Sequence, residues 1–145
     1  MPSSRKIDPA LERRCQERWE EILLEAKANE MSIWESTIYR FEQAHVSDSL
    51  QLTLSTIPFS IRLAMNDFTP EIERLGLEYA PLGIFTSCFV QTNDGRLLFI
   101  EKSKKYYTNK SISFIGGILS KSERLIKNKN DLLSTVREEI TEETH

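Results

Sequence analysis

The sequence predicts an α/β protein in which a helix and a β-hairpin precede a second group of strands and an acidic helix. Apolar residues recur at helical spacing after Asp8-Pro9, and short β-branched and aromatic runs alternate with turn signals from 37 to 115. A glycine pair, Gly116-Gly117, then leads through a polar loop into a helix-like stretch rich in glutamate. The 145 residues have the length of one domain with a modest core.

The composition is that of an ordinary soluble protein, with 39% hydrophobic and 28% charged residues. A net charge of −3 argues against a dedicated nucleic-acid binder. Two cysteines, Cys15 and Cys88, do not make a disulfide framework, so we expect a reducing, cytoplasmic location. The sequence shows no signal-peptide pattern and no run of eighteen apolar residues, so we expect neither export nor a membrane span.

The first helix is expected to begin after Asp8, an N-cap residue, with Pro9 at the first helical position, and to continue to about Asn29. Its predicted packing face consists of apolar residues at helical spacing: Leu11, Cys15, Trp19, Ile22 and Leu23. Next, residues 37–41 and 50–54 alternate in polarity on either side of a turn-like Ser-Asp-Ser, which predicts an antiparallel hairpin.

Three features complete the first half of the chain. His45 has no histidine or cysteine partner at ligand spacing, so we interpret it as structural or solvated rather than as a metal ligand. Residues 57–65 leave strand and helix both open, because Pro58 interrupts a strand. A Thr-Pro-Glu start at residue 69 predicts a short helix that stops near Gly76.

Pro81 and Gly83 mark the predicted boundary between a leader, residues 1–80, and a second segment, residues 81–145. The second segment opens with a nearly continuous apolar strand at 84–90. A continuous apolar strand is typical of burial on both faces, and we expect that here.

The Asn-Asp-Gly turn at 93–95 predicts a hairpin with a return strand directly after it, and a further short strand is expected at 112–115. Between them lies a lysine-rich loop, 101–110. One interpretation is a solvated loop. The other is a substrate-facing loop, in which Lys105 contacts phosphate and Tyr107 stacks on a base.

Carboxylates crowd one side of the C-terminal helix-like stretch. Glu139 shares a helical face with Glu142 and Glu143, and Glu138 lies one turn from Glu142. Like charges at these spacings cost roughly 0.2–0.5 kcal/mol per pair. A hard divalent cation with oxygen ligands would remove that cost, and Mg²⁺ is the usual choice beside phosphates. The alternative interpretation is a solvated acidic face.

These residues resemble a Nudix box, whose pattern is a glycine, five residues, a glutamate, seven residues, and then R-E-U-x-E-E-x-G-U, with U a bulky aliphatic residue. Gly117 and Glu123 match the first half of the pattern. Residues 139–144 match the second half, with Glu139 as the glutamate of R-E.

The chain departs from the Nudix pattern in three places. The spacer after the first glutamate is longer, Glu138 occupies the arginine position, and His145 replaces the glycine. Moving Arg137 into the arginine position would put Thr141 on a metal-ligand position, so we prefer the first alignment. The leader, with Trp19 on its helix and a hairpin after it, resembles the region ahead of the box in larger Nudix hydrolases that act on UDP-sugars.

The resemblance implies an α/β/α sandwich around a mixed sheet, incomplete at the C-terminus, because further strands and a helix follow the box in this family. Residues 81–145 would then be the N-terminal half of a Nudix domain. The implied activity is pyrophosphohydrolase cleavage of the diphosphate linkage in a nucleoside diphosphate derivative, such as a nucleotide sugar, by water activated with Mg²⁺ or Mn²⁺.

The resemblance also implies roles for individual residues. The metal ligands would be the Gly116 carbonyl and the carboxylates of Glu139, Glu142 and Glu143. The residues that orient or deprotonate water, or support the box, would be Glu142, Glu139 and Glu123. The candidate substrate contacts are Lys105, Tyr107 and Arg137.

Other interpretations stay open. The chain could be a fragment, in which case we expect residues 1–145 alone to be poorly stable and weakly active. It could instead keep a Nudix-like shape as an inactive binding or regulatory module, or form a homodimer. An acidic helical interaction protein unrelated to Nudix would require the predicted strands to be absent.

Overall fold

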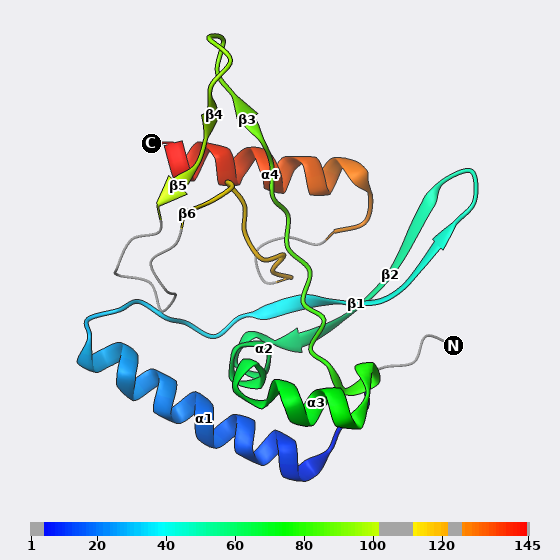
Figure 1. Cartoon of the computed structure of the whole chain (residues 1–145). Helices are drawn as coiled ribbons and strands as arrows, with labels where there is room; N and C mark the ends of the chain where they lie inside the picture. The colour runs from blue at the N-terminus through cyan, green and yellow to red at the C-terminus, as the bar shows by residue number, and fades with distance from the viewer. Residues whose placement is uncertain (1–4, 102–111, 122–125, 145) are drawn as a thin grey trace.

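The structure, a computed structural model, describes residues 5–101, 112–121 and 126–144, without the side chains of residues 143 and 144. The hairpin of β1 (Thr37–Val46) and β2 (Leu50–Pro58) runs through the middle of the molecule (Figure 1). On one side of it lie α1 (Pro9–Ala28), α2 (Phe59–Ala64) and α3 (Thr69–Leu75). On the other side lie β3 (Val90–Gln91), β4 (Leu97–Leu98), β5 (Ile100–Glu101), β6 (Ile112–Ser113) and α4 (Lys129–Thr144).

The described residues form a mixed α/β protein built from helices and small antiparallel sheets, as the sequence predicts at this level. The named strands pair as β1 with β2, β3 with β4, and β5 with β6. None of the helices in the described ranges is long and apolar enough to cross a membrane.

The prediction for the first helix is confirmed. The Asp8 side chain accepts hydrogen bonds from the backbone N–H groups of Ala10 and Leu11, at 3.0 and 2.9 Å, which satisfies two donors that a helix N-terminus leaves free. The buried face of α1 consists of Leu11, Cys15, Trp19, Ile22 and Ala26. Leu23, which we expected on this face, is 39% exposed, because it lies at the margin of the apolar stripe.

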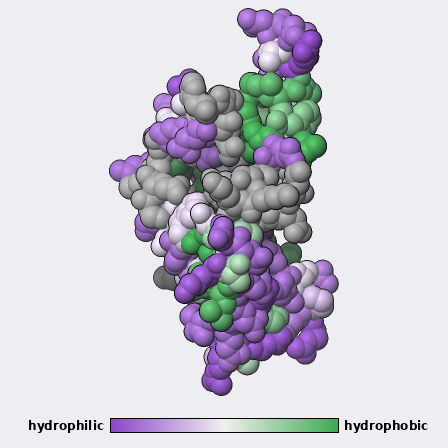
Figure 2. Space-filling model, turned by 90° about the vertical axis from the view of Figure 1, so that its left-hand side faces the viewer, coloured by the Kyte–Doolittle hydropathy of each residue, from purple (hydrophilic) through white to green (hydrophobic). Residues whose placement is uncertain are grey.

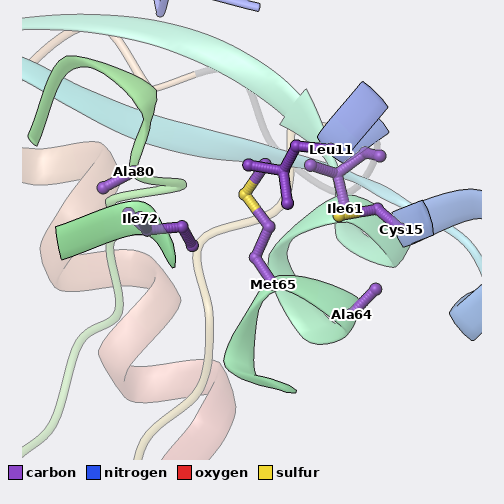
Figure 3. Close-up of a cluster of buried hydrophobic side chains, with 7 residues drawn as sticks. All are labelled: Leu11, Cys15, Ile61, Ala64, Met65, Ile72 and Ala80. Carbon is purple, nitrogen blue, oxygen red and sulfur yellow. The ribbon is translucent and has the colours of Figure 1, made fainter. Parts of the chain in front are cut away.

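A hydrophobic core joins α1 to α2 and α3 (Figure 3). Its members are Leu11, Cys15, Ile61, Ala64, Met65, Ile72 and Ala80. The structure resolves the ambiguity over residues 57–65: β2 ends at Pro58, and α2 follows directly. A helix at this position places Ile61, Ala64 and Met65 on one side, where they pack against α1. The short helix α3 stops before Gly76, as predicted.

The predicted β1–β2 hairpin is confirmed and is longer than its sequence signal. Its register shifts between Phe41 and Gln43, where β1 contains a bulge. Ser47 N–H donates to the Ser49 carbonyl at 3.1 Å across the predicted turn. The far end of the hairpin projects from the body of the molecule (Figure 1), and the exposed His45 lies on it.

The second edge of β1 carries two other segments of the chain. Tyr39 N–H donates to the Leu119 carbonyl at 2.9 Å, and the Tyr39 carbonyl accepts from Ile84 N–H at 3.1 Å. Phe41 N–H donates to the Leu82 carbonyl at 2.9 Å. These bonds tie the predicted leader to the predicted second segment.

The predicted hairpin at 93–95 is present between β3 and β4. Thr92 N–H donates to the Arg96 carbonyl at 2.9 Å, and Gly95 has a φ of 83°, a backbone conformation that favours glycine. The predicted strand at 112–115 is also present, as β6 and a bridge from Ile115 to Cys88.

The expectation that residues 84–90 are buried on both faces is wrong. Phe85 is 67% exposed and Phe89 is 72% exposed. Phe89 and Phe99 flank Phe114, with ring centroids 4.2 and 5.0 Å from it. Figure 2 shows an apolar patch on this part of the molecule, beside the polar tip of the β3–β4 hairpin. A continuous apolar run predicts two buried faces only where another layer covers each of them.

Candidate functional site

The acidic helix α4 begins at a reciprocal cap. The Asn128 side-chain oxygen accepts from the N–H groups of Asn130 and Asp131, at 2.8 and 3.4 Å. The Asp131 carboxylate in turn accepts from Asn128 N–H at 3.0 Å. This is the arrangement of a capping box, built here from asparagine and aspartate. It satisfies free backbone donors at the first turn and so fixes where α4 starts.

Gly116 allows two extended segments of the chain to approach closely. A Cβ atom at Gly116 would overlap the Thr86 carbonyl oxygen and lie 2.7 Å from Ser87 Cα. The carbonyls of Ile115 and Gly117 both accept backbone bonds at 2.9 Å from this neighbouring segment. Because successive carbonyls of an extended strand point to opposite sides, the Gly116 carbonyl points away from it. No described residue donates a hydrogen bond to that carbonyl.

Gly117 contacts the carboxylate of Glu139. A Cβ atom built on Gly117 would lie 2.7 Å from Glu139 Cδ and 2.9 Å from Glu139 Oε2, and closer still to Oε1. The missing side chain of Gly117 therefore provides the space that the half-buried Glu139 occupies. This contact brings the glycine pair and the acidic helix together.

The neighbouring face of α4 lines an open hollow of about 330 Å³. Its described lining residues are Ser134, Arg137, Glu138, Thr141 and Glu142. Three of the predicted site residues are thereby placed. Arg137 and Glu142 lie at the hollow, whereas Glu139 lies against Gly117.

Several predicted site residues lie outside the described part of the chain: Glu123, Lys105, Tyr107 and the side chain of Glu143. Within the described part, no group of three or more His, Cys, Asp or Glu side chains is arranged to hold a metal ion. Of the predicted metal ligands, the structure describes the Gly116 carbonyl, the Glu139 carboxylate and the Glu142 carboxylate. All are oxygen atoms, the ligands that Mg²⁺ and Mn²⁺ prefer.

Tyr39 is a residue near this site that sequence reasoning missed. It is 6% exposed, and its hydroxyl accepts a hydrogen bond from Ile126 N–H at 3.0 Å, just ahead of α4. In the sequence Tyr39 reads only as a strand residue. No local pattern reveals a partner 87 positions away.

No model of a known protein family matches the chain, and no curated protein matches it.

Proposed function

We propose that the chain carries a Nudix-type hydrolase site, which cleaves the diphosphate linkage of a nucleoside diphosphate derivative with Mg²⁺ or Mn²⁺. One observation carries this proposal: the Glu139 carboxylate lies against Gly117. On a fully solvated acidic face, this carboxylate would extend into water instead of lying half-buried against the glycine pair. The proposal extends to the fold, an α/β/α sandwich with a mixed sheet, and to a cytoplasmic location.

The proposed metal ligands are the Gly116 carbonyl, Glu139 and Glu142, with Glu143 as a further ligand. When bound, the metal would neutralise charge on the phosphoryl oxygens and lower the pKa of the attacking water. One of these carboxylates could also orient the attacking water or accept its proton, and Glu139, Glu142 and Glu123 are the candidates for this role.

Substrate recognition is proposed at the hollow along α4. Arg137 lines it, and a guanidinium can donate two parallel hydrogen bonds to a phosphate group. Lys105 and Tyr107 remain proposed contacts to phosphate and base.

Glu138 supports a second candidate, a Nudix-like binding module without turnover. It stands where the family has arginine, and it lines the same hollow as Arg137. A carboxylate there repels an anionic substrate instead of attracting it.

The test is hydrolysis of a panel of nucleotide sugars and dinucleotides with Mg²⁺ or Mn²⁺, using the longest reading frame that contains residues 1–145. Phosphate and nucleoside monophosphate release are measured for the wild type, Glu139→Gln and Glu142→Gln. Metal-dependent stabilisation of the transition state amounts to several kcal/mol, and about 1.4 kcal/mol is a factor of ten in rate. We therefore expect each variant to lose roughly 100-fold in turnover.

Glu73→Gln is the matched control, because it makes the same change at an exposed position on α3, outside the hollow and outside the proposed ligand set. It should retain metal-dependent turnover. A folded protein that Mn²⁺ stabilises without any turnover would favour the binding module. A folded protein with neither turnover nor stabilisation by Mn²⁺ would refute both candidates.

A further inference from the structure

The loop between Gly117 and α4 is anchored on its N-terminal side by β1. Lys121 N–H donates to the Thr37 carbonyl at 2.8 Å, and Ser120 Oγ donates to the same carbonyl at 3.3 Å. Two residues along β1, Tyr39 N–H donates to the Leu119 carbonyl at 2.9 Å. The chain that leaves the glycine pair is therefore held along residues 37–39.

The C-terminal side of the same loop is anchored by the Tyr39 side chain. Its hydroxyl accepts from Ile126 N–H at 3.0 Å. Ile126 lies two residues before Asn128, the cap of α4. Because the Tyr39 side chain is almost completely buried, little water can reach the hydroxyl to replace this hydrogen bond.

The backbone of Tyr39 also bonds to the segment that lies beside the glycine pair. Its carbonyl accepts from Ile84 N–H at 3.1 Å, and the Ile84 carbonyl accepts from Leu119 N–H at 2.9 Å. Backbone bonds thus link Tyr39, Ile84 and Leu119 in a closed set. Ile84 and Leu119 each lie two residues from a hydrogen bond that holds Gly117, in which Thr86 N–H donates to the Gly117 carbonyl.

We infer that Tyr39 is a positioning residue, which sets α4 against the glycine pair and so places Glu139 on Gly117. Residues 37–39 of β1 bond to the chain on both sides of the loop that joins the glycine pair to α4. On the side next to α4, the bond is made by the Tyr39 hydroxyl. The extension of this role to metal affinity rests on the proposed function. The mechanical role does not.

The first test is hydrogen–deuterium exchange of the whole chain with Tyr39→Phe. This change removes the hydroxyl but keeps the ring and all the backbone bonds of Tyr39. We expect faster exchange in peptides that cover 126–136, with α1 unchanged, because the start of α4 loses its anchor. Tyr79→Phe is the matched control: the same atom is removed from a leader tyrosine whose ring lies near Lys6. Equal exchange of 126–136 in the wild type and Tyr39→Phe would overturn the inference.

The second test is Mn²⁺ affinity from thermal shift titrations of the same proteins. Groups that hydrogen-bond directly to metal ligands typically contribute about 10–100-fold to affinity. Tyr39 acts on the proposed ligands only through the start of α4, so we expect a weakening at the lower end of that range, roughly tenfold, for Tyr39→Phe and unchanged binding for Tyr79→Phe. Equal Mn²⁺ affinity in the wild type and Tyr39→Phe would overturn the link to the site. If the wild type does not bind Mn²⁺, that result counts against the proposed function. The hydrogen–deuterium exchange result would still decide whether Tyr39 positions α4.

Discussion

Replacing Glu42 with glutamine is expected to cost more stability than any exposed charge change in this chain. Glu42 Oε2 lies 2.5 Å from Arg40 Nη1, and the two side chains are 5% and 3% exposed. Ser55 Oγ also donates to Glu42, and Arg40 Nε donates to the Ala80 carbonyl at 3.0 Å. The pair therefore joins β1, β2 and the segment that follows α3.

The size of the effect follows from burial. Removing one partner of a buried ion pair leaves the other charge without compensation and costs about 3–5 kcal/mol, whereas an exposed pair contributes about 0–1 kcal/mol. In a chain of this length, 1 kcal/mol lowers Tm by about 3 °C. Glu42→Gln should therefore lower Tm by about 9–15 °C.

The assay is thermal denaturation followed by circular dichroism at pH 7, with Glu71→Gln as the control. Glu71 pairs with Arg14 at the surface, where the side chains are 26% and 47% exposed. We expect this control to change Tm by no more than about 3 °C. If Glu42→Gln lowered Tm no further than Glu71→Gln does, the argument from burial would be refuted.

The same pair predicts a pH dependence. Burial by itself raises the pKa of Glu42, but the hydrogen bonds from Arg40 and Ser55 and the positive charge of Arg40 outweigh it, so the pKa lies below its ordinary value. A lowered native pKa adds stability above the unfolded value of about 4.3, and that stability is lost as the pH falls through the native pKa. The gap in Tm between the wild type and Glu42→Gln should therefore narrow as the pH falls below about 4.3. A gap of constant size from pH 7 to pH 3 would contradict this account.

Two further predictions concern the site and the first helix. Gly117→Ala should displace the Glu139 carboxylate from the glycine pair, because the new Cβ would overlap it. We therefore expect weaker Mn²⁺ binding in the thermal shift assay. Undiminished binding would show that the contact between Gly117 and Glu139 does not contribute to metal affinity. Asp8→Ala should lower the free energy of unfolding by about 1 kcal/mol in urea denaturation, because the Ala10 and Leu11 N–H groups lose their acceptor, and an unchanged midpoint would rule the cap out as a contributor.

Local signals determined much of the fold. Asp8 and Pro9 predict the start of α1, because a cap and a fixed φ act within one turn. The Asn-Asp-Gly turn predicts the β3–β4 hairpin for a similar reason: its backbone conformation depends on neighbours in sequence. The acidic helix is also present where its sequence pattern placed it.

Tertiary packing decided what local patterns left open. Residues 57–65 fit either a strand or a helix, and contact with α1 selected the helix for α2. The exposure of Phe85 and Phe89 depends on which layers cover the second group of strands, and an apolar run carries no information about that.

The candidate site divides in the same way. The sequence by itself determined the glycine pair and the crowded glutamates of α4, because both belong to short patterns with fixed spacing. Only the tertiary structure decided that Glu139 meets Gly117, that Glu142 lies at the hollow, and that Tyr39 anchors the approach to α4. Each of these placements joins residues that are distant in the sequence or depends on how α4 packs, and such contacts leave no periodic trace in the sequence.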